Sequence, residues 1–279
     1  MCRYGLAAIA IGLVCAASAP ALAADVPDLA GGNSTAWFVF NDEFQPPPSG
    51  PGPVTFDKRF PYVDNAAARR AGVQPTYRIA DLSNPILQPW AKEQMRKAND
   101  EVHAGKVPFR ARERCYPAGV PSFVVYTLAE PFYFIQTNKQ VTIINQGGPE
   151  VRRIYLDVPH SAKVTQSWYG ESVGHYEGGD TLVVDTIGIS TKSFVDNYRT
   201  PHTDALHVVE RFKLIEGGNV MEILVSVDDP GAFTTPWSAI QRFRHRQAGP
   251  LLEHICAENN PNYFNYDPVS KPVAEKPDF

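Results

Sequence analysis

The sequence predicts a mainly β protein in which an antiparallel meander closes into a barrel. From Ser122 onward, short runs rich in β-branched and aromatic residues alternate with turn signals. Three separators, at 146–148, 177–180 and 216–219, carry the paired glycines typical of hairpins. No helix pattern interrupts these runs, and a meander of this length tends to close on itself because an open edge invites aggregation. We therefore expect a lipocalin-like barrel.

The candidate strands share β-forming side chains and are bounded by turn residues. They span residues 122–127, 132–137, 141–145, 151–157, 166–168, 173–177, 181–187, 206–215, 220–228, 237–246 and 251–256.

The chain before these strands divides into three parts. Residues 1–23 have a basic Arg3, an apolar run and a small-residue site at their end, which predicts a secretory signal peptide. The apolar run is shorter than the ~20 residues that cross a bilayer, and we expect no membrane span. Residues 24–82 are rich in Pro, Gly and Asn and predict an extended wrapping segment. Residues 83–279 predict a single barrel domain, in a periplasmic or secreted protein.

One helix is expected at the start of that domain. It should begin after Asn84 and Pro85 and end at Gly105. An apolar stripe at helical spacing predicts that it packs against the sheet, and consists of Leu87, Ala91, Met95, Ala98 and Val102.

Two cysteines, Cys115 and Cys256, remain once the leader is removed. Disulfides persist in exported proteins, so we expect these two residues to pair. In the chain-entropy model such a bond could stabilise the fold by ~3–5 kcal/mol. The alternative is a reactive cysteine nucleophile.

Charge and composition narrow the class of partner. The formal net charge is −4 and the pI is about 6.0, without the basic stripe that a phosphate backbone demands, so we expect no nucleic acid. Aromatic residues make up 11% of the chain and gather in its second half. They predict a small hydrophobic or aromatic ligand and no cofactor. The candidate substrate-binding residues are Trp168, Tyr198, Tyr176, Arg153 and Asp157.

Side-chain alternation along a strand locates further polar candidates. In 206–215, Glu210 shares the more apolar face. It should either face a ligand cavity or pair with an inward arginine. In 151–157, Arg153 and Asp157 share one face, so Asp157 and then His160 reach the mouth of the barrel.

Most of the mature chain resembles a family of uncharacterised exported bacterial proteins, in segments that include 87–92, 115–121, 134–137 and 153–157. The match is strongest in 167–189 (SWYGESVGHYEGGDTLVVDTIGI), 201–212 (PHTDALHVVERF) and 228–237 (DDPGAFTTPW). This chain differs from the family in having His175 where a basic residue is expected, and it lacks a glycine-rich step after Asp157. The resemblance implies no activity or catalytic residue.

Acid–base catalysis is the chemistry that these residues favour. A neutral histidine beside a carboxylate can move a proton at physiological pH. His202 is the preferred acid or base, with His160 second, and Asp204, Asp185 or Glu210 could orient it. Alternatively, 201–204 is a simple turn in which the aspartate caps its own backbone.

Three functions remain open. The first is an acid–base enzyme of the lyase, isomerase or hydratase class. The second is a calycin-type protein that binds a hydrophobic ligand without changing it. The third is a metal-dependent enzyme that uses His160 and His202, although their spacing does not match a metal motif. A serine hydrolase is not favoured because no G-x-S-x-G elbow occurs.

Overall fold

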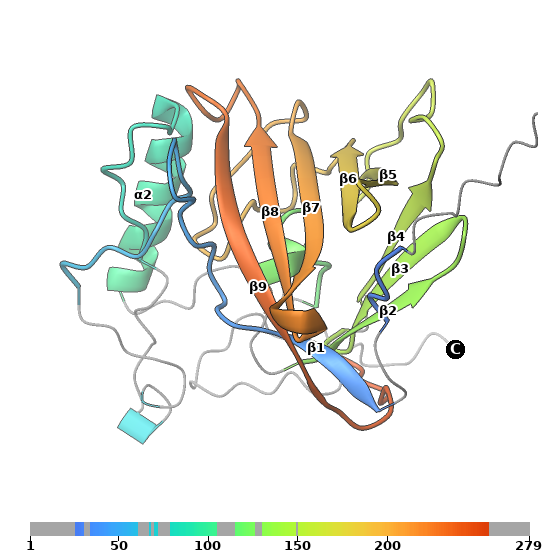
Figure 1. Cartoon of the computed structure of the whole chain (residues 1–279). Coiled ribbons are helices and arrows are strands. Elements are labelled where there is room, and N and C mark those ends of the chain that lie inside the picture. The colour runs from blue at the N-terminus through green and yellow to red at the C-terminus, as the bar shows by residue number, and fades with distance from the viewer. Residues whose placement is uncertain are drawn as a thin grey trace, which may run out of the picture.

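The nine strands found in the described residues close into one barrel (Figure 1). The computed structural model describes residues 26–30, 34–60, 67, 70–71, 79–104, 115–125, 130–148 and 150–256. Strand order follows chain order, and the last strand pairs with the first. The strands are β1 (Thr35–Val39), β2 (Phe132–Gln136), β3 (Gln140–Asn145), β4 (Glu150–Leu156), β5 (Glu171–Glu177), β6 (Thr181–Ile187), β7 (His207–Ile215), β8 (Val220–Asp228) and β9 (Trp237–Gln247). The predicted mainly β barrel is confirmed.

The prediction of an all-antiparallel meander is wrong at one pair of strands. β4 and β5 are parallel, with Ile154 opposite Ser172 and Leu156 opposite Gly174. Parallel neighbours need a connection that returns the chain to the starting end of the sheet. Residues 157–170 make that return, and we call this segment the crossover. The barrel is therefore mixed, and the crossover carries His160 and Trp168.

Three expected strands are wrong. Residues 122–127 contain instead the 3₁₀ helix η2 (Ser122–Val125), because an apolar run alone does not distinguish a buried strand from a buried helical turn. Residues 166–168 contribute only an isolated bridge between Ser167 and Ile189. Residues 251–256 form no strand. They follow β9, whose two edges are already paired with β8 and β1.

The segment that was expected only to wrap the barrel also supplies one of its strands. β1 lies within residues 24–82, and it pairs with β9 over all five of its residues. The signal peptide predicted at 1–23 lies outside the described residues.

The core lies inside the barrel, where alternate residues of each strand are buried. Val208 and Phe212 of β7, like Ile223 and Val225 of β8, have no exposed surface. η2 adds Phe123, whose ring packs edge-on against Phe132 at a centroid distance of 5.3 Å.

The predicted helix is α2 (Pro89–His103), which lies beside the barrel wall (Figure 1). It begins at Pro89, later than expected, because proline suits the first helical position and keeps the preceding Gln88 extended. Ala91, Met95 and Val102 of the predicted stripe are buried, so the stripe packs against the rest of the protein. The expected end at Gly105 lies outside the described residues.

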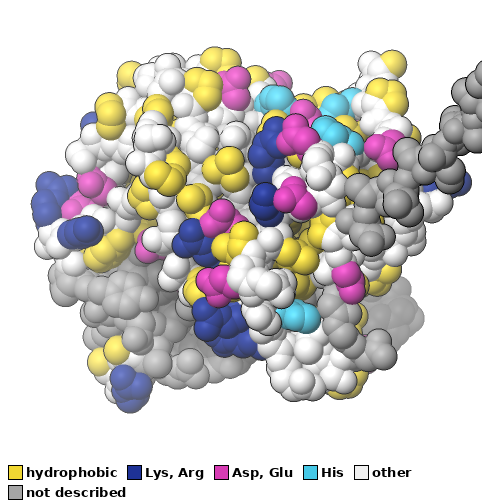
Figure 2. All heavy atoms as spheres, in the orientation of Figure 1, with side chains coloured by type: hydrophobic (Ala, Val, Ile, Leu, Met, Phe, Trp, Pro, Cys, Tyr) yellow, Lys and Arg dark blue, Asp and Glu magenta, His cyan; other side chains and the backbone are white. Residues whose placement is uncertain are grey.

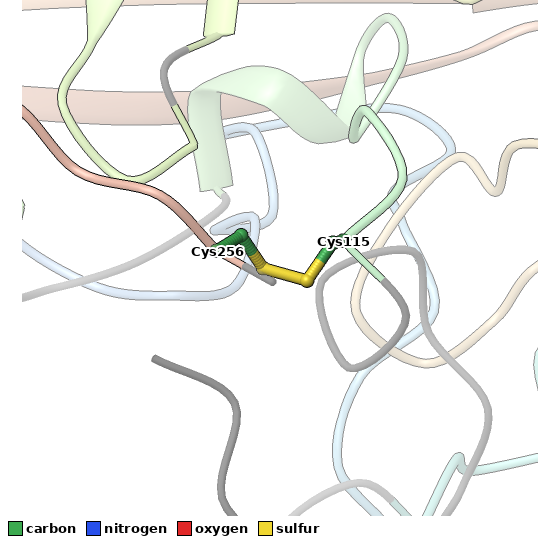
Figure 3. Close-up of a disulfide and its surroundings, with 2 residues drawn as sticks. All are labelled: Cys115 and Cys256. Atoms are coloured by element: carbon green, nitrogen blue, oxygen red, sulfur yellow. A yellow bond between two sulfur atoms is a disulfide. The ribbon is translucent and has the colours of Figure 1, made fainter. Parts of the chain in front are cut away.

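Cys115 and Cys256 form the predicted disulfide (Figure 3). The bond joins the segment before η2 to the chain after β9, 141 residues later. It fits a location outside the reducing cytosol. Within the described part of the chain, we find no helix with the length and apolar character needed to cross a membrane.

Candidate functional site

Two histidines and two carboxylates meet on the outer wall of the barrel. Glu171, Asp185 and His207 come from β5, β6 and β7, at positions that alternate with buried residues. The crossover brings His160 against them. We call these four residues the imidazole–carboxylate cluster. Figure 2 shows histidine side chains beside acidic ones on the face that carries β6 and β7.

The four side chains form a continuous series of contacts. His160 Nδ1 lies 3.0 Å from Glu171 Oε1, and its Nε2 lies 3.0 Å from Asp185 Oδ1. His207 Nε2 lies 3.0 Å from both oxygens of the same Asp185 carboxylate. Ser161 completes the arrangement by donating its backbone N–H and its hydroxyl to Glu171.

Hydrogen bonds hold both carboxylates in the ionised form. The donors of Ser161 and then of His160 lower the pKa of Glu171 below its ordinary value. Burial raises the pKa of Asp185, but hydrogen bonds from His160 and His207 outweigh it, so that pKa is also lowered. Both carboxylates are therefore hydrogen-bond acceptors for the histidine rings that contact them.

His207 is the end of this series that faces solvent. Its Nε2 is directed at Asp185, and among the described contacts its Nδ1 has no partner. Its side chain is 42% exposed, against 22% for His160. An imidazole held by a carboxylate through one nitrogen can exchange a proton with a bound molecule through the other.

The sequence predicted half of this cluster. His160 and Asp185 were both candidates, and the structure brings them together. Glu171 and His207 were missed. The register of β6 and β7 could have indicated His207, because Asp185 lies opposite Val209 and His207 is the next outward position along β7, a diagonal neighbour of Asp185.

His202, the preferred acid or base, is placed elsewhere. Its ring is 4% exposed, with Nε2 3.0 Å from Ser193 Oγ and Nδ1 2.8 Å from the Thr203 carbonyl oxygen. Burial lowers the pKa of His202, against the opposing effects of that carbonyl and of Asp229. Among the described residues, none of the expected orienting carboxylates hydrogen-bonds to the ring, and Asp204 is exposed.

Glu210 lies inside the barrel and is paired. Arg152 Nη1 donates to Glu210 Oε1 at 3.1 Å, and Arg152 Nη2 donates to the second carboxylate oxygen. Neither side chain has exposed surface. The remaining donors of Arg152 reach the hydroxyls of Ser172 and Thr186. Of the two alternatives for Glu210, the structure therefore shows pairing with an inward arginine.

The predicted substrate-binding residues do not form one group. Trp168 is partly buried and stacks on Tyr116, at 5.4 Å between ring centroids, and Tyr116 is 50% exposed. Tyr198 is buried and donates its hydroxyl to Glu43. Tyr176 is partly buried, and its hydroxyl accepts a hydrogen bond from a glutamine. Arg153 and Asp157 are exposed, Arg153 on the outer face of β4 and Asp157 just beyond it.

Gly119 lies between the stacked aromatic pair and His202. Its φ is +76°, and a Cβ built there would lie 2.6 Å from Ser193 Cβ and 2.9 Å from the Trp168 carbonyl oxygen. The backbone of Trp168 is therefore close to the Ser193–His202 pair, and only glycine permits this approach.

Among the described residues, no group of three or more His, Cys, Asp or Glu side chains is arranged to hold a metal ion. Neither a protein-family model nor a curated protein matches the sequence.

Proposed function

We propose that this protein is an exported acid–base enzyme of the lyase, isomerase or hydratase class. The imidazole–carboxylate cluster is its proton-handling group. One observation carries the proposal: Asp185 is shared by two imidazoles, and one of them, His207, is partly exposed and has a ring nitrogen without a partner among the described residues.

His207 acts as the base or acid. Its Nδ1 lone pair takes a proton from a carbon or hydroxyl of the substrate and later returns it. Asp185 keeps the other proton on Nε2 and stabilises the imidazolium that forms. His160, which Glu171 positions through its other ring nitrogen, holds Asp185 in place. A positioned general base of this kind contributes a rate increase of ~10²–10⁴-fold.

The substrate class is a small hydrophobic or aromatic compound. The stacked Trp168 and Tyr116 rings support this class because one of them is half exposed and can take part in a further aromatic contact. Trp168 lies on the same crossover as His160. Export to an oxidising compartment is supported by the disulfide.

Ligand binding without catalysis is the second candidate, and a different observation favours it. A carboxylate buried without a partner inside a barrel would indicate a functional group, but Glu210 is paired with Arg152. Glu210 therefore has a structural role inside the barrel. A barrel in which this inward carboxylate is paired is compatible with a protein that only binds its ligand.

One experiment separates the two functions. The mature protein is incubated with a panel of small aromatic hydroxy and carbonyl compounds, and NMR records which compounds bind and which are converted. We expect conversion of at least one bound compound by the wild type, a loss of ~10²-fold or more in His207→Gln, and no loss in the exposed control His175→Gln. Binding without conversion would favour the carrier, and equal conversion by His207→Gln would remove the cluster from the mechanism.

A further inference from the structure

Two side chains of the barrel make hydrogen bonds to the backbone of a short N-terminal segment. Residues 26–30, which we call the strap, run beside β2 in Figure 1. The Gln136 side chain accepts hydrogen bonds from the backbone N–H groups of Leu29 at 2.6 Å and Ala30 at 3.1 Å. Its amide nitrogen donates to the Pro27 carbonyl at 2.9 Å. Trp37 Nε1 donates to the Leu29 carbonyl at 2.7 Å.

These contacts recognise peptide backbone and one apolar side chain. Leu29 has no exposed surface and belongs to the core. The orientation of the Gln136 amide is fixed because its nitrogen also donates to the Tyr176 hydroxyl at 2.9 Å. All four hydrogen-bonding positions of that amide are therefore used, three of them on the strap.

The strap lies where the barrel is paired least. β1 pairs with β9 at five positions but with β2 only through Trp37 and Phe132. Gln136, at the far end of β2 from Phe132, pairs with Val141 of β3, and its side chain contacts the strap at a position where β1 does not pair with β2.

We propose that Gln136, Trp37 and the position of Leu29 form a binding site for an extended peptide, which the strap fills in cis. The partner that fits is a peptide with one buried leucine-type side chain, two consecutive free N–H groups and a carbonyl two residues earlier. Backbone recognition of this type depends little on the other side chains. The strap is then an autoinhibitory occupant, whose tether gives it a millimolar effective concentration against any competitor.

The test uses the full mature chain and a fluorescein-labelled, C-amidated peptide of sequence Val-Pro-Asp-Leu-Ala. Leu29→Asp should expel the strap, because a carboxylate is not tolerated in the apolar core. Fluorescence anisotropy should then show peptide binding at least ~10-fold tighter than to the wild type. Val26→Asp is the matched control, since Val26 is 51% exposed and its substitution leaves Leu29 seated. Adding Gln136→Leu to Leu29→Asp should abolish binding.

A folded Leu29→Asp variant that does not bind the peptide would overturn the proposal. If Leu29→Asp does not fold alone, the peptide is added during refolding. Recovery of the wild-type near-ultraviolet circular dichroism then supports the site, and failure of the peptide to restore it overturns the site.

Discussion

At the residue scale, Arg152 and Glu210 illustrate how a charge is accommodated inside an apolar barrel. Both side chains are fully buried, Arg152 donates to both carboxylate oxygens of Glu210, and Arg152 also donates to the hydroxyls of Ser172 and Thr186. Burying such a pair costs desolvation that the mutual attraction only offsets, whereas leaving one member alone is strongly unfavourable. The pair therefore specifies how β4 and β7 face each other more than it adds to stability.

Substitution of Glu210 tests that account. Glu210→Leu alone should lower the free energy of unfolding by ~3–5 kcal/mol because it leaves Arg152 uncompensated. The double variant Arg152→Leu/Glu210→Leu should recover most of that loss. Urea denaturation measures both. The exposed pair of Arg242 and Glu222 is the control, where Glu222→Leu should change stability by no more than ~1 kcal/mol. An equal loss in the single and double variants would contradict the pairing argument.

The pH dependence of the folding stability should reveal the lowered pKa of His202. Burial lowers the pKa of this ring below its ordinary value of 6.5, so the unfolded state binds the proton more readily. The free energy of unfolding therefore has its full value above pH 6.5, where the ring is neutral in both states. It decreases as the pH falls from 6.5 through the lower pKa of the folded state. Melting temperatures measured from pH 8 to pH 5 should therefore fall less steeply in His202→Gln than in the wild type. A steeper fall in the variant would contradict the direction of the shift.

The sequence predicted Glu210 as an inward carboxylate because alternation is local to one strand. It did not identify Arg152 as the partner, since that pairing depends on how β4 and β7 lie across the barrel. His202 was selected for its neighbouring acids, yet its ring turns to Ser193 and the Thr203 carbonyl. Adjacency in sequence does not determine the direction of a side chain in a loop.

At the element scale, the crossover is what assembles the candidate site. The strands from β5 to β9 were expected within about two residues because their alternation and glycine turns are local signals. The parallel pairing of β4 and β5 was not expected, because nothing in the 157–170 sequence distinguishes a return connection from a long hairpin loop. That connection carries His160 onto the wall formed by β5 and β6.

Removal of His160 should loosen the crossover. His160→Ala deletes two charge-assisted hydrogen bonds, each worth ~1.5–3 kcal/mol, so local opening should become more frequent. Hydrogen exchange followed by mass spectrometry should show at least ~10-fold faster exchange in the crossover and unchanged exchange in β8. His175→Ala, in an exposed position on β5, should leave the crossover protected. Unchanged crossover exchange in His160→Ala would show that the cluster does not hold it.

At the scale of the whole molecule, closure of the barrel depends on early and late segments of the described chain. β1 completes the barrel against β9, the strap covers the weakly paired β2 edge, and the disulfide joins residues 141 positions apart. In the chain-entropy model a loop of that length stabilises the fold by about 5 kcal/mol. These three connections join segments that are far apart in the sequence, and they support the fixed wall geometry that a positioned imidazole needs for proton transfer.

The most direct measurement of the proton-transfer claim is the incorporation of solvent deuterium into a converted compound. The rates of the wild type and Asp185→Asn are compared, with Asp180→Asn as the control on the exposed turn between β5 and β6. The account predicts a rate at least ~10²-fold lower in Asp185→Asn, because His207 then loses the carboxylate that orients it and stabilises its charge. An Asp185→Asn variant that incorporates deuterium at the wild-type rate would contradict the proposal that this cluster moves the proton.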